Sequence, residues 1–346
     1  MSALLDVTDL RVEFDTYGGT VQAVRGVSFH VDAGQTLAIV GESGCGKSVA
    51  MQAVMGLTPS PPGRITGGSA RLRGKEFLGQ RRVDGRSVCG DEIGMIFQDA
   101  SSSMNPTMRI GDQIAETLVV HRGYSPRKAF SAAIELLEQV RIPDAERRAR
   151  QYPFEFSGGM LQRAMIAVAI ACRPAVLIAD EPTTALDVTI QAQILDLLQQ
   201  LQRDTGMAIV LITHDLAVVA RMADRVSVMY AGQIAESGSV DDLFYRSAHP
   251  YTMGLKTAVP STRFGEDHRL QAIPGSPPDL FSPPTGCAYC ARCEFAMRVC
   301  EADDPPAFRV GDDHASRCWL QHRQMTKAVP GLYQRNFSGP QDVHHE

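Results

Sequence analysis

Residues 41–48 read Gly-Glu-Ser-Gly-Cys-Gly-Lys-Ser, and this stretch decides the fold. It matches the phosphate-binding pattern G-x-x-x-x-G-K-[ST] at each fixed position. The apolar run at 36–40 predicts a buried strand before it, and apolar residues at helical spacing predict a helix after it. Backbone N–H groups of such a loop point at phosphate oxygens, and the helix N-terminus adds positive potential. The predicted nucleotide-binding residues are therefore Gly41, Glu42, Ser43, Gly44, Cys45, Gly46, Lys47 and Ser48.

The composition limits the classes of protein that remain. The chain has 346 residues, of which 44% are apolar, and a formal charge of −5. This length suggests roughly two or three compact units, and the acidic balance argues against a nucleic-acid-binding surface. No uncharged apolar run approaches the roughly 20 residues of a membrane helix, and the N-terminus shows no signal peptide. We therefore expect a soluble protein, or one held at a membrane by a partner.

Short apolar and alternating runs predict the strands of an α/β nucleotide core. These runs lie at 4–14, 23–31, 92–97, 176–179, 208–212, 226–230 and 233–236. Residues 111–173 are predicted to be rich in helix, and one further helix is predicted at 191–201. The expected nucleotide-binding domain spans 1–250, with a helical subdomain inserted at about 100–174.

The composition of the sequence changes after Pro250. Prolines between 274 and 284 predict a stiff, extended connector, and a cysteine-rich segment follows it. We expect a C-terminal extension at 251–325 and a flexible tail at 326–346.

Two adjacent carboxylates follow the predicted strand at 176–179. Asp180 would lie beside the phosphate loop, where it can hold Mg²⁺ together with the Ser48 hydroxyl, while Lys47 reaches the β- and γ-phosphates. Glu181 could then orient and deprotonate the attacking water. An Asp-Glu pair at a helix N-terminus can also serve only the helix dipole. Next to an intact phosphate loop, we interpret the pair as catalytic.

Ser157-Gly158-Gly159 opens a predicted helix, and with it the sequence resembles the ATP-binding-cassette (ABC) superfamily. The matching motifs follow the family's order over roughly residues 4–250. The resemblance implies an α/β ABC ATPase fold with a P-loop RecA-like core, an antiparallel β subdomain and a helical signature subdomain. It also assigns Phe14, or alternatively Tyr17, to adenine stacking, Gln98 to the Q-loop, Ser157, Gly158 and Gly159 to the signature, Ala185, Leu186 and Asp187 to the D-loop, and His214 to the switch histidine.

In this family the signature of one cassette contacts the nucleotide on the phosphate loop of another. The resemblance therefore implies ATP binding between two subunits, and hydrolysis that separates them. Glu181 is the implied general base, and His214 contacts the γ-phosphate and positions the water. Gln98 senses the nucleotide and joins Ser48 and Asp180 as an implied Mg²⁺ ligand.

Several stretches resemble the ATPases of peptide permeases, among them those at 98–106, 229–232, 249–252 and 273–278. This resemblance implies a subunit that hydrolyses ATP to drive peptide import at the cytoplasmic face of the membrane. The implied partners are a second, non-identical ATPase, two transmembrane permeases and an extracytoplasmic binding protein, with no nucleic acid. An importer of nickel, glutathione or antimicrobial peptides is an alternative. A soluble ABC ATPase outside transport and an ATP-binding scaffold without turnover are two more.

Five cysteines lie between residues 287 and 318, and their spacing begins C-x2-C-x2-C-x6-C. Spacing alone suits either tetrahedral Zn²⁺ or an iron–sulfur cluster, and thiols without a metal are a third interpretation. The resemblance to peptide-permease ATPases implies a [4Fe–4S] cluster on Cys287, Cys293, Cys300 and Cys318. Cys290 is then an additional thiol.

Overall fold

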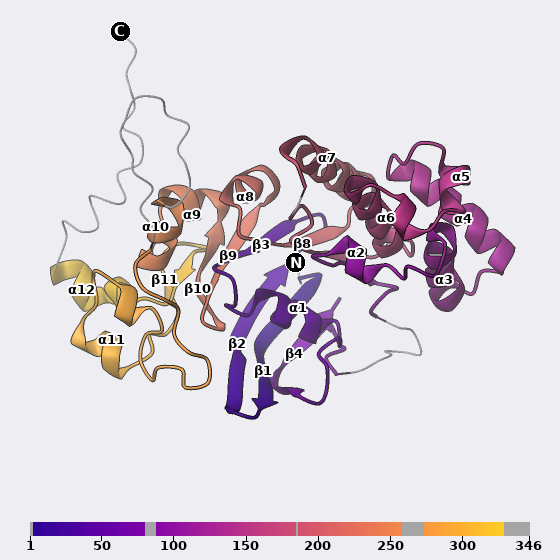
Figure 1. The fold of residues 1–346 in the computed structure, drawn as a ribbon. Coiled ribbons are helices and arrows are strands. Elements are labelled where there is room, and N and C mark those ends of the chain that lie inside the picture. The colour runs from indigo at the N-terminus through magenta and orange to yellow at the C-terminus, as the bar shows by residue number, and fades with distance from the viewer. Residues whose placement is uncertain (1–2, 80–87, 185, 258–272, 329–346) are drawn as a thin grey trace, which may run out of the picture.

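The computed structural model describes residues 3–79, 88–184, 186–257 and 273–328, and it contains two β-sheets (Figure 1). The larger sheet has eight strands in the order β11-β12-β10-β9-β3-β8-β7-β6. Its strands are β3 Thr36–Val40, β6 Ile93–Ile96, β7 Val176–Asp180, β8 Ala208–Thr213, β9 Arg225–Tyr230, β10 Gln233–Ser239, β11 Phe308–Arg309 and β12 Ala315–Ser316. The smaller sheet has the order β2-β1-β4-β5, with β1 Leu5–Thr16, β2 Gly19–Val31, β4 Gly63–Leu72 and β5 Lys75–Glu76.

Five neighbouring strands of the larger sheet, from β9 through β3, β8 and β7 to β6, pair in parallel. Every residue of β3, β7 and β8 is buried, which explains why they read as continuous apolar runs. Helix α1, Lys47–Val54, packs between the two sheets, because its Met51 and Val54 share one core cluster with Ile39 of β3 and Leu5 of β1.

A helical layer follows β6 and covers one end of the larger sheet (Figure 1). Its elements are α2 Ala100–Ser103, α3 Ile110–Arg122, α4 Pro126–Gln139, α5 Ala145–Ala149, the 3₁₀ turn η1 Pro153–Glu155 and α6 Gly158–Ile170. Apolar residues at helical spacing, such as Ile114, Leu137 and Ile166, form its buried core together with Leu198. Leu198 lies on α7, Val188–Thr205, which thus joins this layer to the sheet.

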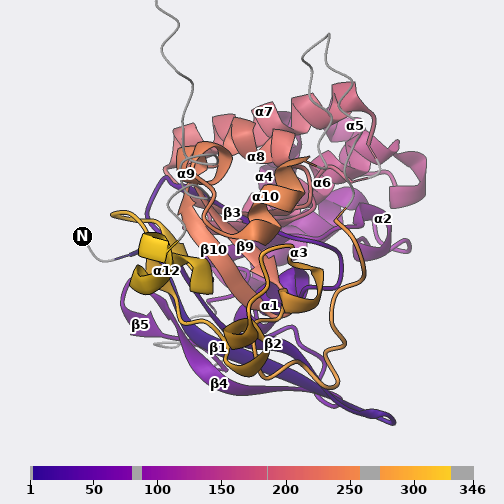
Figure 2. The same cartoon turned by 90° about the vertical axis from the view of Figure 1, so that its left-hand side faces the viewer.

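The C-terminal residues form a lobe on the side of the sheet away from α3–α6 (Figures 1 and 2). The chain reaches it through α8 Leu216–Met222, α9 Val240–Tyr245 and α10 Pro250–Thr257, and the lobe holds η2 Cys290–Arg292, α11 Arg298–Ala302, η3 Trp319–Gln321 and α12 Arg323–Ala328. Strand β12 pairs with β10, so the lobe continues the core sheet. Below that pairing, His314 Nε2 contacts the buried Glu236 carboxylate at 2.7 Å.

The lobe also reaches the antiparallel sheet. The N–H of Gln22 donates to the carbonyl of Leu280 at 2.9 Å, and the Phe281 ring lies against Gly18 at the β1–β2 turn. The C-terminal region therefore contacts both sheets.

Where the sequence predicts a strand, the observed boundaries differ little from the prediction. The sequence did not predict the ten-residue strand β4 or the two-residue strands β5, β11 and β12. Strands β1 and β2 extend to a tight hairpin, in which Gly19 has a φ of 126°. Ala231 and Gly232 both have positive φ, as a two-residue β9–β10 hairpin requires. The tail expected at 326–346 starts inside α12, and residues 329–346 lie outside the described residues. Within the described ranges, no helix is both long enough and apolar enough to span a bilayer.

Candidate nucleotide-binding site

The phosphate loop joins β3 to α1, and two of its glycines are required by close packing. Gly41 has a φ of 154° and Gly46 a φ of 100°. A Cβ on Gly41 would collide with the carbonyl oxygen of Met229, and one on Gly46 with that of Ala23. The loop thus wraps tightly against neighbouring backbone at its base, while Ser43 and Gly44 are exposed at its opening.

The ammonium group of Lys47 is buried within this loop. It donates to the carbonyl of Gly41 at 2.8 Å and to that of Glu42 at 3.0 Å. The Cys45 sulfur lies 3.7 Å from it, and burial raises the pKa of that thiol, so the sulfur stays neutral. The fixed positive charge is what a triphosphate-binding loop needs.

Asp180 and Ser48 meet beneath the loop. The Ser48 hydroxyl donates to Asp180 Oδ1 at 2.9 Å. Asp180 is 3% exposed, and this burial raises its pKa, although the Ser48 hydrogen bond acts in the opposite direction. A carboxylate and a hydroxyl side by side are hard oxygen donors of the kind that Mg²⁺ prefers, so the residues present fit the ion.

Glu181 follows at the carboxyl end of β7, with three side-chain partners. Its Oε2 accepts hydrogen bonds from Gln98 Nε2 at 3.0 Å and from Thr184 Oγ1 at 2.9 Å. Its Oε1 lies 3.3 Å from His214 Nδ1. Gln98, Glu181 and His214 follow β6, β7 and β8, so the parallel sheet brings together three residues that are distant in sequence.

The predicted signature residues and the predicted D-loop residue Asp187 lie at helix N-termini. Ser157 is the N-cap of α6, where its hydroxyl accepts from the N–H of Met160, and Ser157 and Gly158 are exposed. Gly159 packs against Ile190, where a Cβ would lie 2.9 Å from Cγ2. Asp187 caps α7 in the same way as Ser157 caps α6, and the predicted D-loop residue Ala185 lies outside the described residues.

The two aromatic residues predicted to stack on adenine occupy different environments. Phe14 lies on β1 and packs against the core cluster that includes α1. Tyr17 lies at the β1–β2 turn and is fully exposed.

Sequence reasoning missed three residues of the site. Thr184 binds the Glu181 carboxylate, and the N–H of Glu42 donates to Tyr251 Oη at 2.8 Å. Arg292 of the C-terminal lobe pairs with the Glu42 side chain. Thr184 was detectable as a hydroxyl three residues after Glu181. Tyr251 and Arg292 gave no local signal, because their contacts depend on the tertiary fold.

The four cysteines assigned to a cluster gather in the C-terminal lobe. Cys300 and Cys318 are buried, and the N–H of Cys287 donates to the carbonyl of Cys300 at 2.8 Å. Burial raises the pKa of Cys287 to about 12 and that of Cys293 to about 11, and neighbouring thiols add to both shifts. A raised pKa favours the neutral thiol, so these side chains are protonated at neutral pH in the structure. Among the described residues, no three His, Cys, Asp or Glu side chains are grouped to hold a single metal ion.

Comparison with known proteins agrees with this geometry. The family model described as "ABC transporter" matches residues 24–184, and the model described as "Oligopeptide/dipeptide transporter, C-terminal region" matches residues 235–300. The oligopeptide transport ATP-binding protein OppD of Bacillus subtilis is 53% identical to this chain, covering 95% of the chain and 92% of OppD. The chain belongs to the ABC transporter family. The family expected from the sequence is thereby confirmed.

Two further relatives of this ABC transporter protein are dipeptide transport ATP-binding proteins, both named DppD. The protein from Bacillus subtilis is 50% identical, covering 95% of the chain and 98% of the relative. The protein from Lactococcus lactis subsp. cremoris is 49% identical, covering 94% of the chain and 93% of the relative.

Solved structures confirm the predicted ABC ATPase fold. The ATP-binding cassette MJ0796 has been solved as a dimer, and in a dimeric post-hydrolysis state bound to ADP and Pi. Each structure superposes on the ABC transporter chain with a TM-score of 0.58 and 25% identity, covering 68% of the chain and 98% of the cassette.

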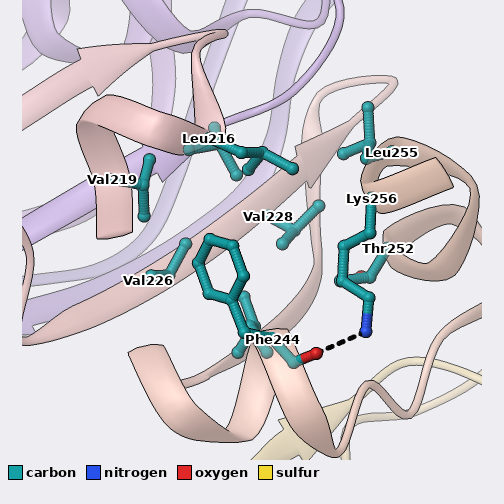
Figure 3. Close-up of a pocket in the computed structure, with 10 residues that line it drawn as sticks. Leu216, Val219, Val226, Val228, Phe244, Thr252, Leu255 and Lys256 are labelled. Carbon is teal, nitrogen blue, oxygen red and sulfur yellow. Dashed lines mark hydrogen bonds between the residues drawn. The ribbon is translucent and has the colours of Figure 1, made fainter. Parts of the chain in front are cut away.

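A separate apolar pocket lies between β9, α8, α9 and α10 of the ABC transporter chain (Figure 3). Its lining residues are Val40, Leu216, Val219, Val226, Val228, Leu243, Phe244, Thr252, Leu255 and Lys256. The Lys256 ammonium already donates to the carbonyl of Phe244 and the hydroxyl of Ser247, both at 2.7 Å. Because the pocket's one cation is paired within the chain, we assign no ligand to it.

Proposed function

We propose that this chain is the ATP-binding and ATP-hydrolysing subunit of an ABC importer that takes up peptides. The proposal rests on one observation above all, which is that Glu181 is held by three side chains beside the Ser48–Asp180 pair and the phosphate loop. Relatives of about 50% identity over nearly the whole chain, named for oligopeptide and dipeptide transport, support peptide as the substrate.

Each residue of the site has a role in this reaction. Lys47 and the loop N–H groups bind the phosphates, and Glu181 accepts the proton of the attacking water. His214 and Gln98 hold the Glu181 carboxylate. In the proposed reaction His214 would also contact the γ-phosphate. Mg²⁺, when bound by Ser48, Asp180 and Gln98, neutralises charge on the phosphates.

The exposed signature supports the proposal that the site is completed by a second subunit. Ser157 and Gly158 stand at the N-terminus of α6, where helix N–H groups suit a phosphate from another chain. We therefore propose that the working unit pairs this chain with a second, non-identical ABC ATPase. The pair would bind two transmembrane permeases at the cytoplasmic face of the membrane, supplied by an extracytoplasmic substrate-binding protein.

The C-terminal lobe, which we call the cysteine lobe, is proposed to hold a [4Fe–4S] cluster on Cys287, Cys293, Cys300 and Cys318. The supporting observations are that the N–H of Cys287 donates to the carbonyl of Cys300 at 2.8 Å, and that Cys300 and Cys318 are both buried in this lobe. The cluster would link the ends of the lobe as a structural cross-link. Iron and acid-labile sulfide analysis of anaerobically purified protein tests this. Cys293→Ser should lose both and Cys290→Ser should keep them, whereas stoichiometric zinc would contradict the proposal.

Peptide uptake in reconstituted vesicles tests the main proposal. The vesicles contain both ATPases, the permeases and the binding protein, with ATP on the side of the ATPases and labelled peptide on the other. Lys47→Ala in this chain, combined with a disabled companion ATPase, should abolish uptake. Uptake at the parent rate would overturn the proposal. Uptake of a nickel chelate or glutathione in place of peptides would contradict the peptide substrate alone.

A further inference from the structure

Arg292 of the cysteine lobe forms an ion pair with Glu42 of the phosphate loop. Arg292 Nη1 lies 2.7 Å from Glu42 Oε2, and Arg292 Nη2 lies 2.9 Å from Glu42 Oε1. This is a bidentate pair, in which the planar guanidinium matches both carboxylate oxygens. The side chain of Arg292 is 5% exposed and that of Glu42 is 26% exposed, so solvent screens the pair far less than a surface salt bridge.

Arg292 is itself fixed by other parts of the fold. Its Nε donates to the carbonyl of Pro274 at 2.8 Å, and its Nη1 also contacts Tyr230 Oη at 3.2 Å. The guanidinium lies 5.9 Å from the centre of the Tyr289 ring. The connector, the end of β9 and the cysteine lobe thus set its position together, and the guanidinium acts as a rigid anchor.

Glu42 passes this constraint to the phosphate-binding lysine. Its carbonyl accepts a hydrogen bond from the Lys47 ammonium at 3.0 Å, and its N–H donates to Tyr251 Oη at 2.8 Å. The backbone of Glu42 is therefore held on the Lys47 side while its carboxylate is held on the Arg292 side. A shift of Glu42 would displace both the loop and its contact with Lys47.

We propose that Arg292 is a positioning residue for the phosphate loop, and that it makes nucleotide affinity depend on the fold of the cysteine lobe. By holding the Glu42 carboxylate, it keeps the loop in the conformation that binds phosphate. The proposal rests on the proposed function, because it assumes that residues 41–48 bind ATP. Arg292 touches no phosphate itself and acts through Glu42.

Nucleotide binding by the full-length chain tests this inference. Arg292→Gln should raise the dissociation constant for a fluorescent ATP analogue by roughly tenfold, a typical coupling between side chains in contact. Arg292→Lys should also weaken binding, because an ammonium cannot reproduce the bidentate fork. Arg298→Gln, which changes an exposed arginine of the same lobe, is the matched control and should bind as the parent does.

A double-mutant cycle separates positioning from general stabilisation. If Arg292 acts through Glu42, the double variant Arg292→Gln with Glu42→Gln should bind no more weakly than Glu42→Gln alone. Additive losses would contradict the proposal. An unchanged dissociation constant for Arg292→Gln would also contradict it, if the variant has a lower Tm than the parent and is measured well below that Tm. Such a result would mean that Arg292 only stabilises the fold. If Arg292→Gln does not fold, Arg292→Lys decides between the same outcomes.

The parent chain and Lys47→Ala distinguish this inference from the proposed function. If the parent binds ATP and Lys47→Ala does not, an unchanged affinity in the Arg292 variants overturns the inference alone. If Lys47→Ala binds as well as the parent, both the proposed function and the inference fail.

Discussion

Glu181 has a φ of 46°, in a region that residues with side chains seldom adopt. Such backbone strain persists only where the surroundings hold it, and it is concentrated at functional sites. Here the surroundings are the hydrogen bond from the N–H of Glu181 to the carbonyl of Ile212 and the contacts to Gln98, Thr184 and His214. These contacts hold the carboxylate between Gln98, Thr184 and His214.

Replacing Glu181 with Gln removes the proton acceptor but preserves the size of the side chain. We expect hydrolysis by the assembled complex to fall by about 10²–10⁴-fold, the usual contribution of general base catalysis. ATP binding should persist, because Lys47 and the loop are unchanged. Phosphate release and nucleotide titration check both parts. Glu135→Gln, at an exposed carboxylate of α4, is the control. Hydrolysis by Glu181→Gln at the parent rate would remove Glu181 from the reaction.

The environments of the two aromatic candidates favour Tyr17 over Phe14 for stacking on adenine. An exposed ring can stack on a base, and such stacking is worth about 1–3 kcal/mol. Tyr17→Ala should therefore raise the ATP dissociation constant roughly tenfold, or about 1.4 kcal/mol, without lowering Tm. Phe14→Ala should lower Tm, because it opens a cavity in the core. Nucleotide titration with thermal unfolding measures both, and a loss of affinity confined to Phe14→Ala would reverse the assignment.

The sequence predicts those residues whose chemistry is encoded locally. Gly41 and Lys47 belong to one loop, so spacing alone finds them. Arg292 could not be found in this way, because it lies 250 residues from Glu42, and only the packed lobe brings the two together. The neighbouring residues Cys290 and Cys293 predict metal binding, and nothing in their pattern predicts a contact with the phosphate loop.

At the scale of elements, prediction succeeds where burial produces a strong pattern. Strands β3, β7 and β8 are entirely buried, and their apolar runs identify them. Strands β11 and β12 have two residues each, too few for any periodic signal. Their existence depends on pairing with β10, which is a tertiary property.

The start of α10 carries a buried titratable group, His249. The N–H of Tyr251 donates to its Nδ1 at 3.0 Å, so Nδ1 is unprotonated. Burial lowers the pKa of His249 to about 4, although the nearby Glu236 carboxylate and a hydrogen bond to the Arg317 backbone favour the charged form. The folded chain therefore holds this histidine neutral at pH values where the unfolded chain protonates it.

This difference predicts a loss of stability in mild acid. Because the folded-state pKa of His249 is depressed, its contribution is complete above the unfolded value of about 6.5 and is lost as pH falls toward about 4. The full effect is on the order of 3 kcal/mol. Urea unfolding at a series of pH values measures it. His249→Gln should flatten the profile over this range, and an equally steep profile in that variant would assign the effect to other groups.

At the scale of the whole molecule, the signature and the phosphate loop belong to different structural layers of one chain. The signature begins α6 in the helical layer, whereas the loop begins α1 between the two sheets. The order of motifs predicted both layers. It could not predict how the C-terminal lobe continues the core sheet, because that arrangement is set by the pairing of Glu236 with Ser316 across β10 and β12.

If a second subunit uses the signature, a bulky charge there should block hydrolysis without affecting nucleotide binding. Ser157→Arg should bind ATP as the parent chain does and should abolish hydrolysis in the assembled complex. Ser125→Arg is a matched control, because Ser125 caps α4 with the same 3.4 Å contact to an N–H three residues on. Weakened ATP binding by isolated Ser157→Arg would contradict a role between subunits.

The two-residue strands at the end of the larger sheet have a consequence for biogenesis. Until β12 has been synthesised, the outer side of β10 presents unpaired N–H and C=O groups, a template for pairing with another chain. A ribosome-bound chain that already contains the phosphate loop and the Asp180–Glu181 pair would therefore still have an unpaired strand edge that can pair with another chain. The segment that covers this edge also carries the clustered thiols, so protection from aggregation and assembly of the cysteine lobe occur together, late in translation.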